Sequence, residues 1–270
     1  MRQGRVITLL TDFGNQDAYV GIMKGVITRI NPSANIIDIC HANPPQDIMN
    51  GAYLLFTSYK YFPRGTIHVA VIDPGVGSAR GIVCVETHDY LFLVPNNGLL
   101  SFIAGKEKPE RIIQVTNRKY FLPAPSNTFH GRDIFAPVAA HLSLGLKPRQ
   151  LGTRVDRLEC FDIPKPHYKR IGHIEATIIS VDRFGNLITS ITGEDIEGLK
   201  QNQKDIEVTV GKKKLVGLQK TYTDVKAGKP LALLGSTDFL EISVNQGDAQ
   251  RYFGVKKGDT VCIRLLPRKK

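Results

Sequence analysis

The sequence has no tryptophan, and its four cysteines are scattered among 270 residues without a CxxC pair. Neither a disulfide framework nor a zinc site is therefore expected. Three of the four lie in strand-like segments, where a cysteine usually serves as a small buried hydrophobic residue. They are Cys40, Cys84 and Cys262, with Cys160 outside such a segment.

Long apolar runs are also missing. No stretch of about 18 apolar residues occurs, so no membrane span is expected. The apolar part of the N-terminus is too short for a signal peptide and is interrupted by Asp12. We expect a cytoplasmic protein. GxGxxG and GxxxxGK[ST] are absent as well, which argues against dinucleotide and P-loop phosphate sites.

The chain carries 36 Lys and Arg against 25 Asp and Glu, a net charge of +11. Such a charge raises the possibility of nucleic-acid binding. The basic residues are evenly divided, with 18 in residues 1–167 and 18 in 168–270. No RNA-recognition or zinc-finger signature is present. We therefore do not expect a nucleic-acid partner.

The first half alternates strand-like and helix-like segments with short connections. This pattern predicts an α/β domain with a doubly wound, largely parallel sheet over residues 1–167. A proline-rich stretch, 151–170, then leads into strand–turn–strand patterns with little helix. These predict an all-β barrel domain over 168–270. The expected strands include 5–10, 34–39, 66–72 and 260–265, with two strands joined by a turn over 172–191. The expected helices include 19–30, 48–61 and 134–144.

Polar residues follow several predicted strands, where α/β sheets bind ligands. Asp12 and Asp73 end strands, and the latter begins a tight Asp-Pro-Gly loop that leads to Arg80. Asp17 is placed to cap the first helix. Asn96 precedes an Asn-Gly turn. His130 lies where another helix begins, and Asp133 is expected to cap that helix. Further polar residues at predicted loop positions are Asp182, Asn186 and Ser236.

An Asp, an Arg and a His together can position and activate a water molecule. The carboxylate accepts a hydrogen bond, His takes a proton and Arg stabilises negative charge on oxygen. The alternative is a metal site made of Asp12, Asp73, His41 and His130, although no HxH or HxxxH spacing supports it.

Five stretches give the chain a specific resemblance: TDFGNQDAYVG, IDPGVGSAR, PNNGLL, FHGRDIFAP and VDRFGNLITSI, with GSTDFLEISVN as a weaker sixth. In their order they resemble the S-adenosylmethionine (SAM) hydroxide adenosyltransferases, relatives of the fluorinase and chlorinase. The resemblance implies an N-terminal α/β domain and a C-terminal β-barrel. It also implies a homotrimer with sites between the first domain of one subunit and the second domain of the next.

The resemblance further implies the residues of the site. The catalytic residues would be Asp73, Arg80 and His130. Asp12 would bind the ribose, and Asp17 would lie near the same end of the ligand. The full set of implied substrate-binding residues is Asp12, Asp17, Asn96, Phe129, Asp182, Phe184, Asn186, Ser236, Glu241 and Asn245.

The implied reaction is hydrolysis of SAM to adenosine and L-methionine, by attack of an activated water or hydroxide on ribose C5′. SAM is then the substrate, and no cofactor or metal is expected. The halogenases have an aromatic hydroxyl residue where this chain has Asp73, and an extra loop that this chain lacks. Thr237 stands where the fluorinase has Arg, which leaves the methionine contacts open. The alternatives are a halogenase that uses chloride and a non-catalytic protein that binds SAM or adenosine.

Overall fold

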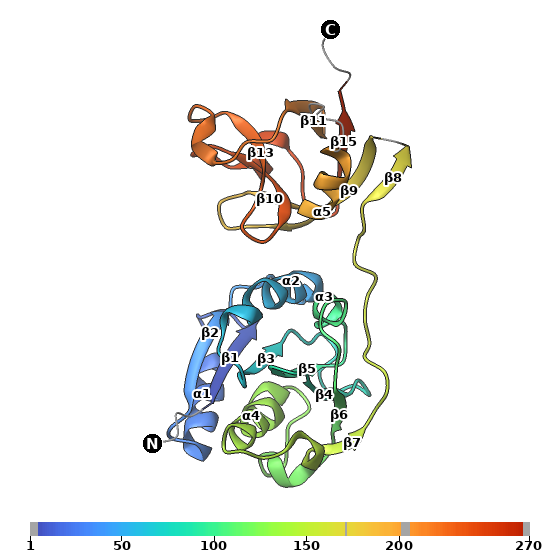
Figure 1. The fold of residues 1–270 in the computed structure, drawn as a ribbon. Coiled ribbons are helices and arrows are strands. Elements are labelled where there is room, and N and C mark those ends of the chain that lie inside the picture. The colour runs from blue at the N-terminus through green and yellow to red at the C-terminus, as the bar shows by residue number, and fades with distance from the viewer. Residues whose placement is uncertain (1–4, 171, 201–205, 267–270) are drawn as a thin grey trace. The chain divides into compact units, whose positions relative to one another are not determined.

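The computed structural model describes residues 5–170, 172–200 and 206–266. The chain divides into two compact units, Met1–Asp162 and Ile163–Lys270 (Figure 1). The expected boundary at 167/168 falls within strand β8 (His167–Arg170), which pairs with β9 (His173–Val181) of the second unit.

The first unit is built on a seven-stranded sheet with the order β2-β1-β3-β5-β4-β6-β7. β1 pairs in parallel with β2 and β3, and β3 pairs in parallel with β5. The other three pairs are antiparallel. The sheet is thus mixed, because the β4–β5 hairpin reverses the chain. The strands are β1 (Val6–Thr11), β2 (Asn35–Cys40), β3 (Ile67–Val71), β4 (Ile82–Glu86), β5 (Leu91–Pro95), β6 (Arg111–Val115) and β7 (Gly152–Arg154).

Helices cover both faces of this sheet (Figure 1). They are α1 (Tyr19–Ile30), α2 (Ile48–Ser58), α3 (Ser101–Ala104) and α4 (Ala136–Ser143). α1 and α4 pack together, and α1 buries Val20, Met23 and Ile27 at helical spacing. Met23 and Ile27 share a core with Val69 of β3. On the other side, Gly51 of α2 lies so close to β3 that a Cβ would come 2.2 Å from Ile72 Cδ1.

Two predicted helix caps are wrong. α1 has Ala18 at its N-cap and no side-chain capping bond, and Asp17 is exposed. Asp133 lies inside a π-helical turn, Gly131–Phe135, which precedes α4. Its carboxylate is used elsewhere, as described below. Asp47 does cap a helix of this unit, because it accepts a hydrogen bond from Asn50 N at the start of α2.

The second unit is a nearly closed antiparallel barrel, with the strand order β12-β11-β15-β9-β10-β14-β13 and β8 beside β9. Alternate residues of β9 and β15 enter its core, among them Ile174, Ala176 and Ile263. Beyond β12, Gln219 N donates to Ala232 O of β13, which draws the two ends of the sheet together. The remaining strands are β10 (Leu187–Thr192), β11 (Ile206–Val210), β12 (Lys213–Val216), β13 (Pro230–Leu234), β14 (Phe239–Val244) and β15 (Thr260–Leu265).

Two short helices, α5 (Gly193–Lys200) and α6 (Ala249–Phe253), accompany the barrel. α6 is capped by Asp248, which accepts from Arg251 N, and ends at Gly254 with φ +67°. Such a left-handed C-terminal residue is usually glycine.

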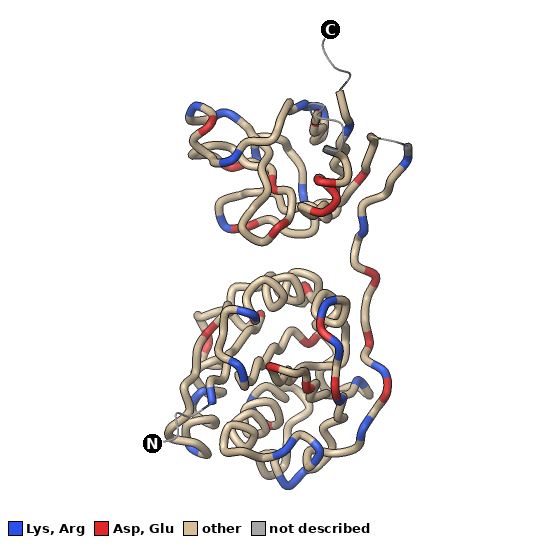
Figure 2. The backbone as a smooth tube through the Cα atoms, in the orientation of Figure 1, with Lys and Arg blue, Asp and Glu red and all other residues tan. Residues whose placement is uncertain are grey.

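No helix in the described part of the chain has the length and apolar character needed to cross a bilayer. Figure 2 shows Lys and Arg distributed along both units.

Candidate active site

Three neighbouring strands bring their following residues to one edge of the first sheet. β1, β3 and β5 are parallel and adjacent, and Thr11 pairs with Val71. Asp12 follows β1, Asp73 follows β3 after one further residue, and Asn96 follows β5. The carboxyl edge of the sheet therefore collects these polar side chains, as expected from the strand pattern.

Asp73, Arg80 and His130 form one hydrogen-bonded cluster at this edge. Arg80 Nε donates to Asp73 Oδ1 at 2.8 Å, and Arg80 Nη2 donates to Asp73 Oδ2. The same Nη2 lies 3.2 Å from His130 Nδ1. Only 4% of the Asp73 side chain and 12% of the Arg80 side chain are exposed. Since arginine can only donate, His130 Nδ1 accepts, and the neutral ring carries its proton on Nε2.

The environment keeps His130 neutral. Burial lowers its pKa below the usual value, and the positive charge of Arg80 lowers it further. The carboxylates of Asp73 and Asp133 act in the opposite direction but do not prevail. In this state Nε2 can donate a hydrogen bond to a water molecule, and the ring can take a proton only at Nδ1, in place of the hydrogen bond from Arg80.

Close contact between two loops holds the cluster together. Gly77 has φ +77°, and a Cβ on it would lie 2.3 Å from Asn127 O, so the loop from Asp73 to Arg80 needs glycine at this point. At the end of β3, Asn97 Nδ2 donates to Ile72 O at 2.9 Å. Asn97 thus fixes the backbone directly before Asp73.

Asp133 fixes the segment that leads to His130. Its carboxylate accepts from Ser126 N and Ser126 Oγ, each at 2.8 Å, and from Arg132. Ser126 Oγ in turn accepts from Phe129 N at 3.1 Å. Burial opposes ionisation of Asp133, but the hydrogen bonds from Arg132 and Ser126 prevail and lower its pKa. The π-helical turn that contains Asp133 is a conformation often found at functional sites.

Aromatic rings gather beside the cluster. Phe129 packs against Phe13 and Tyr19 with centroid distances of 5.9 and 5.1 Å. Gly131 fits beneath them, because a Cβ there would lie 3.2 Å from Met23 Sδ and 3.3 Å from Phe13 Cε2. These rings provide an apolar surface next to the polar cluster.

Of the other predicted site residues in the first unit, Asp12 and Asn96 accept backbone hydrogen bonds, whereas Asp17 is exposed. Asp12 Oδ2 accepts from the backbone N of Gln46 at 2.8 Å. Asn96 Oδ1 accepts from Glu159 N at 2.8 Å, so it holds the segment after β7. Asp17 is exposed in the loop between β1 and α1.

In the second unit, the turn between β9 and β10 presents an exposed ring on a rigid frame. Asp182 Oδ1 accepts from the backbone N of Phe184 and of Asn186, and Asp182 Oδ2 accepts from Asn186 Nδ2. Gly185 has φ +83°, and a Cβ there would lie 2.3 Å from Asp248 Oδ1. Phe184 is 75% exposed. Asp182 and Asn186 therefore shape the turn, while Phe184 is open to a ligand.

Strand β14 separates the remaining predicted residues. Asn245 follows its end, near the β9–β10 turn, and donates to Val225 O at 2.7 Å. Ser236 is exposed in the β13–β14 turn, at the other end of the strand. Glu241 lies between them and accepts from Tyr222 Oη and Ser243 Oγ, each at 2.7 Å. The structure therefore does not bring all of these side chains to one point.

Sequence reasoning missed several supporting residues. The PNNGLL motif pointed to its first Asn, whereas Asn97 is the residue that holds the strand end at Asp73. The hydrogen bond between Ser126 and Asp133 joins residues that are seven positions apart, and no sequence pattern indicates such a contact. Tyr222 was also missed; burial and its hydrogen bond to Glu241 raise its pKa. In the sequence, Tyr222 is a single aromatic residue between two threonines, and such a residue is not a specific indication of a site.

The alternative metal site loses its second histidine. His41 is buried, with Nδ1 2.8 Å from Thr11 Oγ1 and Nε2 3.1 Å from Asp38 Oδ1. Its two ring nitrogens thus face Thr11 and Asp38.

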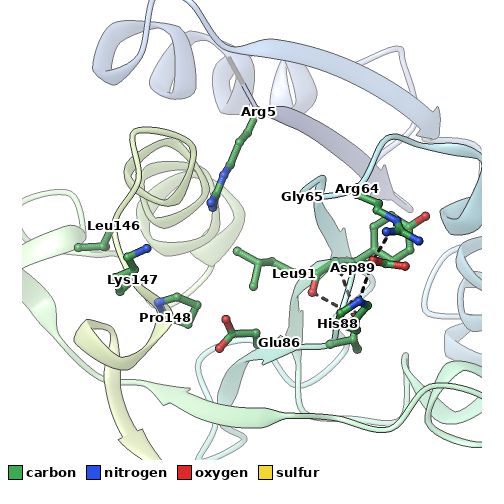
Figure 3. A pocket seen from close by; sticks show the side chains of 12 residues that line it. Arg5, Arg64, Gly65, Glu86, His88, Asp89, Leu91, Leu146, Lys147 and Pro148 are labelled. Atoms are coloured by element: carbon green, nitrogen blue, oxygen red, sulfur yellow. Dashed lines mark hydrogen bonds and ion pairs between the residues drawn. The ribbon is translucent and has the colours of Figure 1, made fainter. Parts of the chain in front are cut away.

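A separate hollow of about 350 Å³ lies at the other edge of the same sheet. Arg5 reaches into it from the start of β1, and the ion pair of Arg64 and Asp89, 3.1 Å apart, lines it (Figure 3). The residues that line it include none of Asp73, Arg80 and His130. It is therefore distinct from the cluster of Asp73, Arg80 and His130.

Comparison with known proteins identifies the family to which this fold and site belong. The SAM hydroxide adenosyltransferase N-terminal domain matches residues 7–152, and the C-terminal domain of the same family matches 176–262. The chain belongs to this family.

Individual relatives agree with that assignment. An (R)-S-adenosyl-L-methionine hydrolase from Thermus thermophilus is 37% identical over 97% of this chain and 100% of its own length. A fluorinase from Actinoplanes is 26% identical over 96% of this chain and 97% of its own. The crystal structure of an uncharacterized conserved protein from Thermotoga maritima has a TM-score of 0.90 and 38% identity, covering 96% of this chain and 99% of that one.

Proposed function

We propose that this protein hydrolyses SAM to adenosine and L-methionine. The observation that carries the proposal is the cluster of Asp73, Arg80 and His130, a buried carboxylate, a guanidinium and a neutral histidine within hydrogen-bond reach of one another. The 37% identity to an (R)-S-adenosyl-L-methionine hydrolase, over 97% of this chain and 100% of that protein, supports the choice of substrate.

In the proposed step, a water oxygen attacks ribose C5′ in line with the C5′–S bond. That bond breaks, and its electron pair passes to sulfur, which leaves as the neutral thioether of methionine. One water proton stays on the new 5′-hydroxyl, and the other is taken by Asp73 or His130 and released to solvent. Arg80 stabilises the developing hydroxide. A sulfonium is a good leaving group, so neither a general acid nor a cofactor is needed.

The charge change of the step suits a sheltered site. A hydroxide-like oxygen and a sulfonium lose their charges as they react, so exclusion of bulk water favours the transition state over the separated ions. The low exposure of Asp73 and Arg80, together with the ring of Phe129 nearby, supports this.

The proposed substrate contacts come from both units. Asp12 would bind the ribose hydroxyls, and the exposed ring of Phe184 would stack on adenine. Asp17, Asn96 and Phe129 would complete the contacts of the first unit. The second unit would add Asp182, Asn186, Ser236, Glu241 and Asn245, of which Asp182 and Asn186 act mainly by shaping the turn.

We also propose a homotrimer in which the site is completed by the second unit of a neighbouring subunit. The support is the division of candidate contact residues between two compact units and the exposure of Phe184. Light scattering of the purified protein tests the trimer. The proposed substrate is a water-soluble charged metabolite, which favours a cytoplasmic location.

Hydrolysis is preferred to halogenation because a carboxylate at Asp73 repels a halide ion. Fluorinases are also more distant from this chain than the hydrolases, at 26% against 37% identity.

The test is incubation of the purified protein with SAM in chloride-free buffer made with heavy-oxygen water, followed by mass spectrometry. We expect adenosine that carries one heavy oxygen, and free methionine. No adenosine, with SAM still bound in calorimetry, would contradict hydrolysis and leave a binding protein. A halogenated nucleoside formed only after chloride is added would instead establish the halogenase.

A further inference from the structure

A row of His, Glu and Cys side chains, of the kinds that can bind metals, crosses the outer face of the barrel. Glu175 of β9 is the register partner of Cys262 on β15 and of His167 on β8. His173 precedes Glu175 by two residues on the same strand, so its side chain lies on the same face. The alternate residues Ile174 and Ala176 point into the barrel core.

Three of these side chains are close enough to share one ion. One ligand atom from each of His173, Glu175 and Cys262 lies within 4.8 Å of the others. All three are partly buried rather than fully exposed. They come from two paired strands of a regular sheet, so the backbone holds their spacing without any ion.

From this juxtaposition we propose that His173, Glu175 and Cys262 form a Zn²⁺ site. An imidazole nitrogen, a carboxylate oxygen and a thiolate sulfur are all zinc ligands, and the thiolate selects against Mg²⁺ and Ca²⁺. A thiolate and a carboxylate balance the two charges of the ion. The fourth position falls to water or to His167, the register partner of Glu175.

One contact opposes the ion. Lys169 Nζ donates to Glu175 Oε1 at 2.7 Å, with the lysine side chain 49% exposed. Zinc would displace this ammonium group, and the exposed side chain is free to move into solvent. Lys169 therefore competes with the metal and weakens its binding.

The site lies wholly within the second unit, whereas Asp73, Arg80 and His130 lie in the first. Its role would be structural, since it joins β9 to β15 through side chains. The scattered cysteines gave no indication of it, because its ligands are brought together by strand pairing and not by sequence spacing.

The first experiment is a titration of the full-length, reduced, metal-free protein with Co²⁺, a spectroscopic substitute for Zn²⁺. We expect a thiolate-to-cobalt charge-transfer band that saturates at one equivalent. Cys262→Ser should abolish the band, and Cys160→Ser, at an exposed cysteine, should leave it unchanged. Absence of the band in the parent protein, or its persistence in Cys262→Ser, would overturn the proposal.

The second experiment measures Zn²⁺ affinity by competition with a chromophoric chelator. His173→Gln should weaken binding by at least the roughly 10- to 100-fold that loss of a supporting outer-shell group costs. His88→Gln, at an exposed histidine of the first unit, is the matched control. Lys169→Met should strengthen binding, because it removes the competing cation. Equal affinity in the parent and His173→Gln, with both correctly folded by circular dichroism, would overturn the proposal.

Discussion

The two units of this protein present their candidate functional residues in opposite ways. In the first, Asp73, Arg80 and His130 are linked to one another and largely buried. In the second, Phe184 is 75% exposed on a turn held by Asp182. We infer a division of labour between these two groups of residues: the buried cluster would perform the chemistry, and the exposed turn would contribute to substrate recognition.

This difference has a physical basis. A group that stabilises charge in a transition state works best when it is already oriented and shielded from water. A group that stacks on a base needs an open face, and its rigidity lowers the entropy lost on binding. Substitutions in the cluster of Asp73, Arg80 and His130 should therefore change kcat, and substitution of Phe184 should change KM.

The largest effect is expected for Asp73→Asn. The change removes the carboxylate that orients the water and pairs with Arg80, so kcat should fall by about 10²- to 10⁴-fold. The dissociation constant for SAM, measured by calorimetry, should stay within a few-fold of the parent. Asp156→Asn, at an exposed acidic residue, is the control. Parent-like turnover by Asp73→Asn would remove Asp73 from the proposed mechanism.

For Phe184→Ala we expect a smaller effect, on substrate binding and not on kcat. Loss of stacking on adenine should weaken SAM binding by about 1–3 kcal/mol and leave kcat nearly unchanged. The melting temperature should also be unchanged, because the ring is exposed. Tyr61→Ala, at a tyrosine that is 73% exposed in the first unit, is the matched control. A fall in kcat without a change in KM would contradict the division of labour.

Ser126→Ala tests the support behind His130. The substitution removes a hydrogen bond to Asp133 and the acceptor for Phe129 N. The free energy of unfolding should therefore fall by about 1–2 kcal/mol. Loss of alignment at His130 should lower kcat by about tenfold with little change in KM. Ser58→Ala, where the hydroxyl bonds only within its own helix, is the control. A change in stability alone would make Ser126 a purely structural residue.

The smallest effect concerns the pKa of His130, measured by NMR titration. Burial and the charge of Arg80 lower this pKa, so the ring should remain neutral at pH values somewhat below 6.5, the usual pKa of histidine. Arg80→Gln should raise it, since the repelling charge is removed. His141 is an internal control, because burial alone lowers its pKa. An equal change in the pKa of both histidines in Arg80→Gln would show that the charge of Arg80 is not the cause.

The positions of two acidic residues of the candidate site could be predicted from the sequence. The strand patterns ending at Asp12 and Asp73 placed both at the carboxyl edge of one sheet, and the structure has them there. The all-β character of the second unit and the limits of β15 were also confirmed. Local hydrophobic patterns determine such features, and they are visible in the sequence.

What could not be predicted depends on tertiary contact. The Asp133–Ser126 interaction and the use of Asn97 in place of Asn96 need the folded loops. The mixed sheet follows from the β4–β5 hairpin, whose place in the sheet order depends on strand pairing. The separation of Ser236 and Asn245 by β14 likewise depends on strand pairing.

The most direct test of the central claim uses SAM that carries deuterium stereospecifically at C5′. If Asp73, Arg80 and His130 direct one water in line with the leaving sulfur, the adenosine formed must show inverted configuration at C5′. Retained configuration would contradict the account, because it requires two displacements, with Asp73 or another side chain bonded to C5′ between them.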